Sequence, residues 1–281
     1  YIHNLDFYPM GTTESCEIDL EKLFTDGFST ENSSIREPQN IFTYSVLSII
    51  AVSGNQKDQE GEQGIPAFDY YMAPGVLRTF KKQFRQSIYD ILEYTDYDKF
   101  IAINGIEREI DKLNTIDFDI ENFYKFTRGA VELKRMFRIT YKSALDKTNK
   151  LVYQAMEAFV HNLNSLCTEN NNAKFTTINI GTDTSMEGRM VTLNLFKCIE
   201  EGIGNNEKPI SPITVFKVKK GANYNKDDKN YDLLQKACEL VKSKKNVCFE
   251  FLDASFNRQK YKEGDYNTEV AYLESGSRII D

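Results

Sequence analysis

The chain has 281 residues, with 35 Lys and Arg against 42 Asp and Glu, and so a formal net charge of −7. Hydrophobic residues make up 41% and charged residues 27%, which is the composition of a globular protein and excludes an intrinsically disordered one. The acidic balance argues against a general nucleic-acid-binding protein, because such proteins need a basic surface that displaces counterions. No run of about 18 apolar residues occurs, and the N-terminus lacks a signal-peptide pattern, so no membrane association is expected.

The cysteines and histidines limit the chemistry that is available. The five cysteines are odd in number, none belongs to a CxxC pair, and they are Cys16, Cys167, Cys198, Cys238 and Cys248. This pattern favours free thiols in a reducing, cytoplasmic compartment and predicts no metal site. Only two histidines occur, which disfavours a histidine-based metal centre or a Ser-His-Asp triad. Since His161 lies in an apolar helical pattern, we expect it to be a core residue.

The first third of the chain predicts short elements. Residues 1–8 begin in the middle of a pattern without an initiator Met, and we expect them to continue a strand or loop from a removed upstream segment. Apolar spacing predicts a short helix over 16–24 that ends near Gly27, and a second helix over 39–54. The polar, glycine-rich stretch 54–66 predicts a loop outside the core.

The remainder predicts a helical layer followed by an α/β layer. From 76 to about 169, apolar residues recur at helical spacing, which predicts several helices that can pair with another subunit. Strands are then expected over 175–180, 213–218 and 247–252, alternating with helices over 186–201 and 231–244. This alternation predicts right-handed crossovers, a parallel sheet and therefore an α/β fold.

The segment 181–185 is a candidate ligand-binding loop, because it leaves a predicted strand and opens a predicted helix. Thr182, Thr184 and Ser185 supply hydroxyl groups there, and a helix N-terminus can bind phosphate. The alternative is a helix cap by Thr184 or Ser185 with Glu187 in the first turn, and the two roles can coexist. Neither GxGxxG nor a Walker A motif occurs, which disfavours a dinucleotide-binding or P-loop enzyme.

Ser15 and Cys16 precede the first predicted helix. A thiol at a helix start can have a lowered pKa, which would make Cys16 a candidate nucleophile. The alternative is that Cys16 is a small buried hydrophobic residue.

Short motifs along nearly the whole chain together resemble one known family. The runs are Ile2–Tyr8, Ile18–Leu20, Gly27–Thr30, Arg36–Gln39, Phe68–Tyr70, Met72–Val76, His161–Asn164, Ile178–Asn179, Gly181–Ser185, Glu187–Arg189, Phe216–Lys219, Asn223–Asn225, Asn230–Leu233, Asp253–Ala254, Phe256–Asn257 and Glu269–Tyr272. In this order they resemble the catalytic subunit of anaerobic (class III) ribonucleoside-triphosphate reductases, which are glycyl-radical enzymes.

The resemblance implies the first half of a ten-stranded α/β barrel, with a helical dimerisation layer. The chain would be a single incomplete barrel domain, 1–281, in which 1–75 is the N-terminal barrel part, 76–170 the helical layer, and 171–281 the βαβ half-barrel with the start of an inner loop. In the family, that loop carries a cysteine that a glycyl radical on a separate segment converts to a thiyl radical. The reaction reduces ribonucleotides to deoxyribonucleotides for DNA synthesis.

The resemblance also implies partners. They are ribonucleoside triphosphates, dNTP or ATP effectors, a second copy of the chain, and an activase that uses S-adenosylmethionine and an iron–sulfur cluster. We expect no cofactor bound by this chain itself, since the segments that carry the glycyl radical, a cysteine-rich metal site and an ATP-binding cone are not among these 281 residues.

The sequence departs from the family pattern at positions that matter for chemistry. The family's Met-Gly-Cys-Arg-Thr-Arg reads Leu273–Arg278, which puts Ser275 at the thiyl position. A hydroxyl cannot replace that thiol, because an O–H bond is much stronger than an S–H bond. His-Gly-Gly-Gln-Ser reads 60–64 and keeps Gln63, whereas the effector-coupling loop, His-Ser-Arg-Ala-Gly, reads 167–171 with Glu169 in place of arginine. A cysteine pair becomes Ser15-Cys16, and which of the two fills the family role is open.

Three hypotheses follow. The first is a reductase homologue or fragment that is inactive as this chain alone, and the second is a catalytically silent nucleotide-binding or dimerisation module. A glycyl-radical enzyme acting on another substrate is disfavoured, because the matching runs belong to the reductases. The expected catalytic positions are Cys16, Ser15 and Ser275, which would line one pocket with Gln63. Substrate or effector contacts are expected at Gln63, Asn171, Lys174, Thr182, Thr184 and Ser185.

Overall fold

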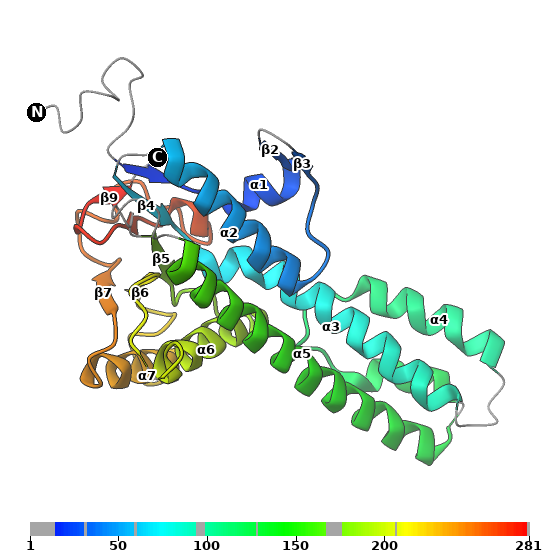
Figure 1. The fold of residues 1–281 in the computed structure, drawn as a ribbon. Coiled ribbons are helices and arrows are strands. Elements are labelled where there is room, and N and C mark those ends of the chain that lie inside the picture. The colour runs from blue at the N-terminus through cyan, green and yellow to red at the C-terminus, as the bar shows by residue number, and fades with distance from the viewer. Residues whose placement is uncertain are drawn as a thin grey trace, which may run out of the picture.

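A five-stranded parallel sheet forms one side of the molecule (Figure 1). The computed structural model describes residues 15–30, 33–58, 61–93, 99–127, 129–166, 176–205 and 207–279. The strand order is β1 (Ser15–Glu17), β4 (Glu62–Ile65), β5 (Thr176–Ile180), β6 (Ile213–Val218) and β7 (Val247–Phe251). Every pair is parallel, so the predicted α/β fold is confirmed, and the described residues form five strands of an open sheet.

Helices connect the strands and cover one face of the sheet. They are α1 (Leu20–Asp26), α2 (Ile41–Asp58), α3 (Phe68–Glu93), α4 (Lys99–Lys112), α5 (Val131–Leu166), α6 (Met186–Glu201), α7 (Tyr231–Lys242) and the 3₁₀ helices η2 (Ile120–Thr127) and η4 (Tyr266–Thr268). Two antiparallel hairpins complete the described fold: β2 (Phe28–Thr30) with β3 (Ser33–Ile35), and β8 (Ala271–Tyr272) with β9 (Arg278–Ile279).

The two faces of the sheet differ in what covers them. Because side chains alternate along a strand, Ile178 and Ile180 lie on the face that packs against the helices, which we call the helix face. Asn179, between them, points to the opposite face, where it bonds the β8–β9 hairpin. We call this the hairpin face. It carries a small apolar cluster of its own, made of Val215, Leu252, Val270 and Tyr272.

The helical layer forms an arm that extends beyond the sheet (Figure 1). The distal halves of α3 and α5 lie in this arm with α4. Its core is aromatic, and Phe80, Phe84, Phe118, Phe123 and Tyr141 contact one another through their rings. The predicted helical layer is therefore confirmed. Helix α3 runs without a break through residue 75, where the boundary between the N-terminal barrel part and the helical layer is expected. The helix that follows β4 therefore continues into the arm.

Two local predictions in the first third are wrong. Cys16 lies in β1 rather than in a helix, and α1 begins only after Asp19, whose side chain accepts the Lys22 N–H. Segment 54–66 is not a loop outside the core, because α2 continues to Asp58 and β4 lies between β1 and β5. Backbone pairing on both sides holds this polar strand in the sheet, and composition does not reveal such partners. The predicted end of α1 at Gly27 is confirmed, with φ 71°.

The later elements agree closely with the sequence. Helix α6 and strand β6 have the predicted bounds, and β5, α7 and β7 differ by two residues or fewer at either end. His161, in contrast, is exposed on α5 and is not a core residue, so that expectation is wrong. In the described part of the chain, no helix is long and apolar enough to cross a membrane.

Candidate functional site

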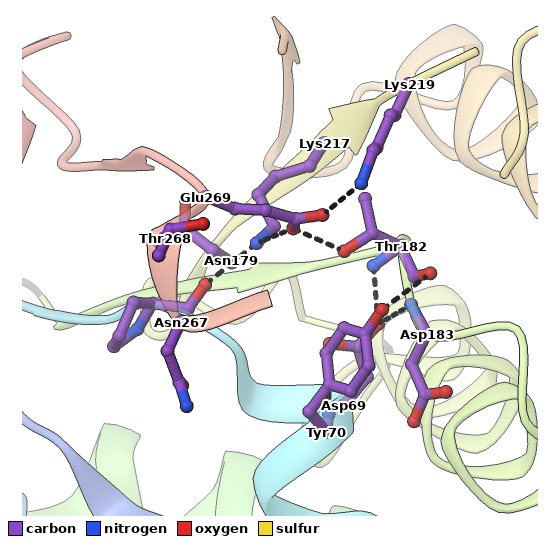
Figure 2. A network of polar contacts seen from close by, with 12 residues as sticks. Asp69, Tyr70, Asn179, Thr182, Asp183, Lys217, Lys219, Asn267, Thr268 and Glu269 are labelled. Atoms are coloured by element: carbon purple, nitrogen blue, oxygen red, sulfur yellow. Dashed lines mark hydrogen bonds and ion pairs between the residues drawn. The ribbon is translucent and has the colours of Figure 1, made fainter. Parts of the chain in front are cut away.

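The carboxyl ends of β4, β5 and β6 meet the segment 267–269 in a buried polar network (Figure 2). At its centre, Glu269 accepts hydrogen bonds through both carboxylate oxygens. Lys217 Nζ lies 2.7 Å from Oε2, and Lys219 Nζ lies 2.8 Å from Oε1. The Thr182 hydroxyl also donates to Oε2, at 2.7 Å. The side chains of Lys217 and Glu269 are 0% and 1% exposed, so this ion pair is inside the protein.

Charge decides the protonation of this cluster. Burial by itself would raise the pKa of the Glu269 carboxyl, but the ammonium groups of Lys217 and Lys219 outweigh burial and hold that pKa below its ordinary value. Burial would lower the pKa of Lys219, and Glu269 reverses this effect and raises it. Glu269 is therefore an ionised carboxylate with two cations and one hydroxyl around it.

A second buried carboxylate, Asp69, lies at the start of α3. It accepts the backbone N–H of Gly181 at 2.7 Å and of Asp183 at 3.3 Å, and so fixes the turn that leaves β5. Burial and the nearby Asp183 raise the pKa of Asp69 to about 7, although Lys217 and these two N–H groups act in the opposite direction. Burial therefore favours the neutral form of Asp69 more than that of an ordinary carboxyl group.

The predicted ligand loop 181–185 is built mainly by internal bonds. The Ser185 hydroxyl accepts the Gly188 N–H at 3.0 Å, which confirms a helix cap at this residue. The Asp183 carboxylate accepts the Ser185 N–H at 2.8 Å and lies against Gly188. A carboxyl group of the protein thus already occupies the N-terminus of α6, which makes that end less favourable for a phosphate.

Glu187, in the first turn of α6, faces the arm rather than the loop. Its carboxylate accepts the Ile116 N–H at 2.6 Å and the Thr115 hydroxyl at 3.2 Å. The side chain is buried and ties α6 to the segment between α4 and η2. Glu187 is therefore a structural link between the sheet layer and the helical arm.

An open cleft of about 410 Å³ adjoins the network, at the carboxyl ends of β6 and β7. Its lining includes Lys219, Lys220, Asp253, Asn257, Arg258, Tyr261, Glu263 and Glu269. A volume of this size accommodates a small organic ligand. Three cations and three carboxylates line it, so its charge is balanced and does not select for an anion.

The segment after Glu269 crosses the hairpin face of the sheet. From Glu269, beside the carboxyl end of β6, the chain reaches Tyr272, whose backbone N–H and C=O both bond the Asn179 side-chain amide, at 2.9 and 3.0 Å. It then reaches Ser275, in the turn between β8 and β9. There the Ser275 hydroxyl lies 3.1 Å from a carboxylate oxygen of Glu62, the first residue of β4. The segment thus runs from the carboxyl edge of the sheet to its amino edge.

The structure places the predicted catalytic residues on two faces. Ser15 pairs with Glu62, and matched residues of parallel strands point to the same face, so Ser15 lies on the hairpin face with Ser275. Cys16 pairs with Gln63 on the helix face. The Asn55 side-chain amide of α2 donates to Cys16 Sγ at 2.8 Å and to Gln63 Oε1 at 2.9 Å.

This arrangement changes the expectation for the Cys16 thiol. Burial raises its pKa, and the Asn55 hydrogen bond only partly offsets this effect. The expectation of a thiol activated by a helix start is wrong, because β1 holds Cys16 and Asp19 caps α1. Cys248, in β7, pairs with Val215 and so lies on the hairpin face, where burial and the charges of Glu250 and Glu274 raise its pKa. The turn that holds Ser275 contains no cysteine.

The remaining predicted residues fall into two groups. Thr182, Thr184 and Ser185 lie at the carboxyl edge, Thr184 with a partly exposed side chain. Asn171 and Lys174 lie outside the described residues. The site residues that sequence reasoning did not single out are Asp69, Asn179, Lys217 and Glu269. The sequence does contain a signal for Lys217, since this lysine lies inside an apolar strand. A lysine buried in such a strand requires a partner of opposite charge.

Comparison with known proteins connects this architecture to one family. The family model for "Anaerobic ribonucleoside-triphosphate reductase" matches residues 1–278. The chain belongs to the anaerobic ribonucleoside-triphosphate reductase family. The resemblance inferred from the sequence motifs is thereby confirmed.

Curated members of this reductase family give the extent of the likeness. The anaerobic ribonucleoside-triphosphate reductase of Enterobacteria phage T4 is 26% identical over 243 residues, which are 86% of this chain and 33% of the phage protein. Those of Haemophilus influenzae and Escherichia coli are 23% and 24% identical over the same share of this chain, and 28% of each relative is covered. The chain therefore spans a third or less of the length of these reductases.

Proposed function

We propose that this chain is a homologue or fragment of the catalytic subunit that reduces ribonucleoside triphosphates to deoxyribonucleotides for DNA synthesis. The observation that carries the proposal is the family match over residues 1–278, within which the hairpin across the sheet holds Ser275 against Glu62. This chain would supply the first half of a ten-stranded barrel, with 1–75, 76–170 and 171–281 as its parts. Ribonucleotides, dNTP or ATP effectors, an activase and a cytoplasmic location belong to the same proposal.

The chain's own residues would hold and shape the site rather than carry the radical. A glycyl radical, where the complete enzyme has one, would supply hydrogen-atom abstraction, and this chemistry needs a thiol, whose S–H bond is weak. Ser275 does not fit that relay, because an O–H bond is much stronger. Ser15, the other candidate on the hairpin face, is also a hydroxyl. We therefore propose no radical step in this chain.

The proposed nucleotide contacts differ in how accessible their side chains are. Thr184 has a partly exposed side chain in the loop after β5, whereas the hydroxyls of Thr182 and Ser185 already bond protein groups. Gln63 is buried on the helix face beside Cys16 and would act by fixing the strand rather than by touching a nucleotide. Asn171 and Lys174 complete the proposed effector contacts.

A reductase assay tests the proposal. The purified chain is incubated anaerobically with a family activase, reductant and each ribonucleoside triphosphate, beside a family catalytic subunit that has the cysteine as a positive control. We expect no deoxyribonucleotide above the protein-free background. Formation of deoxyribonucleotide by this chain alone would refute the proposal that it carries out no radical step.

The alternative is a catalytically silent nucleotide-binding or dimerisation module. What favours it is that both candidate positions on the hairpin face, Ser15 and Ser275, are hydroxyls while the aromatic core of the arm is intact. Equilibrium binding of dNTPs, with a sizing measurement, separates the two. A monomer with no nucleotide affinity would remove the module hypothesis.

A further inference from the structure

The carboxylate of Glu269 fixes one end of the hairpin that crosses the sheet. We call this end, at the carboxyl edge of the sheet, the base of the hairpin. We propose that Glu269 is a positioning residue that latches this hairpin and thereby sets where Ser275 lies over the amino end of β4. The relevance of the latch to ribonucleotide reduction rests on the proposed function. The latch itself is a property of the fold and can be measured without any activity.

Three donors converge on Glu269 from parts of the sheet. Lys217 and Lys219 belong to β6 and its carboxyl end, and Thr182 follows β5. Strand pairing from β4 to β7 holds these donors independently of Glu269. Glu269, in contrast, belongs to a segment whose strands β8 and β9 have only two residues each. Loss of the carboxylate should therefore release the hairpin and leave the sheet in place.

The other anchors of the hairpin are weaker, and they include an exposed hydrogen bond from Arg278 to the Phe256 carbonyl oxygen at 3.1 Å. Asn179 holds Tyr272 with neutral amide hydrogen bonds, whose net contribution is about 1 kcal/mol each. Glu62 holds Ser275 at an exposed site, where water competes with the bond. Bonds between ionised groups inside a protein are stronger than either. The position of the turn that holds Ser275 therefore depends mainly on the contacts of Glu269.

Packing of the residues after Glu269 extends the effect of its ion pairs along the hairpin. Val270 and Tyr272, directly after Glu269, belong to the apolar cluster on the hairpin face with Val215 and Leu252. Because these side chains are buried, the segment cannot slide along the sheet while Glu269 is held. Fixing residue 269 thus fixes the direction in which the chain leaves the carboxyl edge toward residue 275.

Hydrogen–deuterium exchange by mass spectrometry tests the latch in the full chain. Glu269→Gln keeps the size of the side chain, but its amide N–H₂ group faces an ammonium group. We expect peptides over 270–279 to exchange about tenfold faster or more, and β6 peptides, which carry the unpaired Lys217 ammonium, to change much less. Asp232→Asn is the control, because it breaks the 2.7 Å ion pair of Arg189 with Asp232 in another part of the fold. It should leave hairpin exchange unchanged.

A second variant separates positioning from general stability. Lys217→Met with Glu269→Gln removes the buried ammonium that the single variant leaves without a partner, so thermal stability should recover while hairpin exchange stays fast. The double variant also gives the answer if the single variant does not fold. The proposal is overturned if hairpin exchange stays at the wild-type rate, if exchange rises uniformly over the chain, or if the double variant restores slow exchange. Each of these results leaves the reductase assay above unaffected.

Discussion

At the scale of single residues, Asp69 shows how burial prepares a group for proton exchange. Its carboxylate makes no contact with solvent, and three backbone N–H groups, of Tyr70, Gly181 and Asp183, donate to it. The N–H groups favour the ionised form, and burial favours the neutral one. Burial has the larger effect, so the pKa is raised to about 7.

This shift predicts a pH dependence of stability. The folded-state pKa of about 7 lies above the ordinary value of 3.8, so ionising Asp69 costs folding free energy as pH rises between these values. From pH 5 to 8 the wild type should lose on the order of a few kcal/mol more than Asp69→Asn, which has no proton to lose. Urea unfolding at both pH values measures this difference.

The control for that prediction is Asp232→Asn. Asp232 is partly exposed, and its hydrogen bond from Arg189 lowers its pKa, so it stays ionised across this pH range. Its removal should leave the slope between pH 5 and 8 as in the wild type. Parallel curves for wild type and Asp69→Asn would contradict the assigned shift.

At the scale of elements, two helical glycines have opposite surroundings. A Cβ added at Gly188, in the first turn of α6, would lie 2.0 Å from Asp183 Oδ2, whereas one added at Gly54 in α2 meets nothing within 4 Å. Gly188→Ala should destabilise by about 1–3 kcal/mol, because Asp183 is held by its own bonds. Gly54→Ala should stabilise by about 0.5–1 kcal/mol, since alanine favours a helix.

Chemical denaturation of both alanine variants checks this pair. The measurement is the free energy of unfolding, compared with wild type under the same conditions. Equal effects of the same sign at both positions would show that the close approach of Asp183 to Gly188 is not a constraint.

The elements also show what sequence patterns can predict here. Helix α6 and strand β6 were predicted with their observed bounds, because each has a strong apolar period and clear end signals. Strand β4 was missed, since its stability comes from β1 and β5 on either side rather than from its own residues. The apolar spacing from Cys16 onward likewise predicts a helix where β1 ends, because the pairing of β1 with β4 is not visible in its own residues.

The site was predictable only in part. Thr182 and Ser185 stood out as hydroxyls between a strand and a helix, and Ser185 is indeed a cap. The bond of Thr182 to Glu269 joins residues that are 87 positions apart, which no local pattern reveals. Ser15 and Cys16 are neighbours in sequence, yet strand alternation sends them to opposite faces, and this follows only once β1 is known to be a strand.

At the scale of the whole molecule, the helical arm offers the surface for the proposed dimer. Val131 and Ile139 of α5 are 79% and 54% exposed, so both apolar side chains are accessible to a second copy. If the arm pairs with a second copy, Val131→Glu with Ile139→Glu should weaken self-association about tenfold or more, because two charges would be buried.

Analytical ultracentrifugation over a range of concentrations measures this association, with circular dichroism to verify the fold. Val241→Glu is the matched control, since Val241 is 40% exposed on α7, away from the arm. Unchanged association of the double variant, or a monomeric wild type, would contradict a dimer through this arm.

The buried Lys217 also has a consequence for biosynthesis. Its carboxylate partner is made 52 residues later, so a nascent chain on the ribosome contains the lysine of β6 well before Glu269 has emerged. Moving an ammonium group into the interior without a counter-ion is strongly unfavourable. We therefore expect that the Lys217 side chain is enclosed only after translation has passed residue 269, so that the hairpin face of the sheet closes later than β6 pairs with its neighbouring strands.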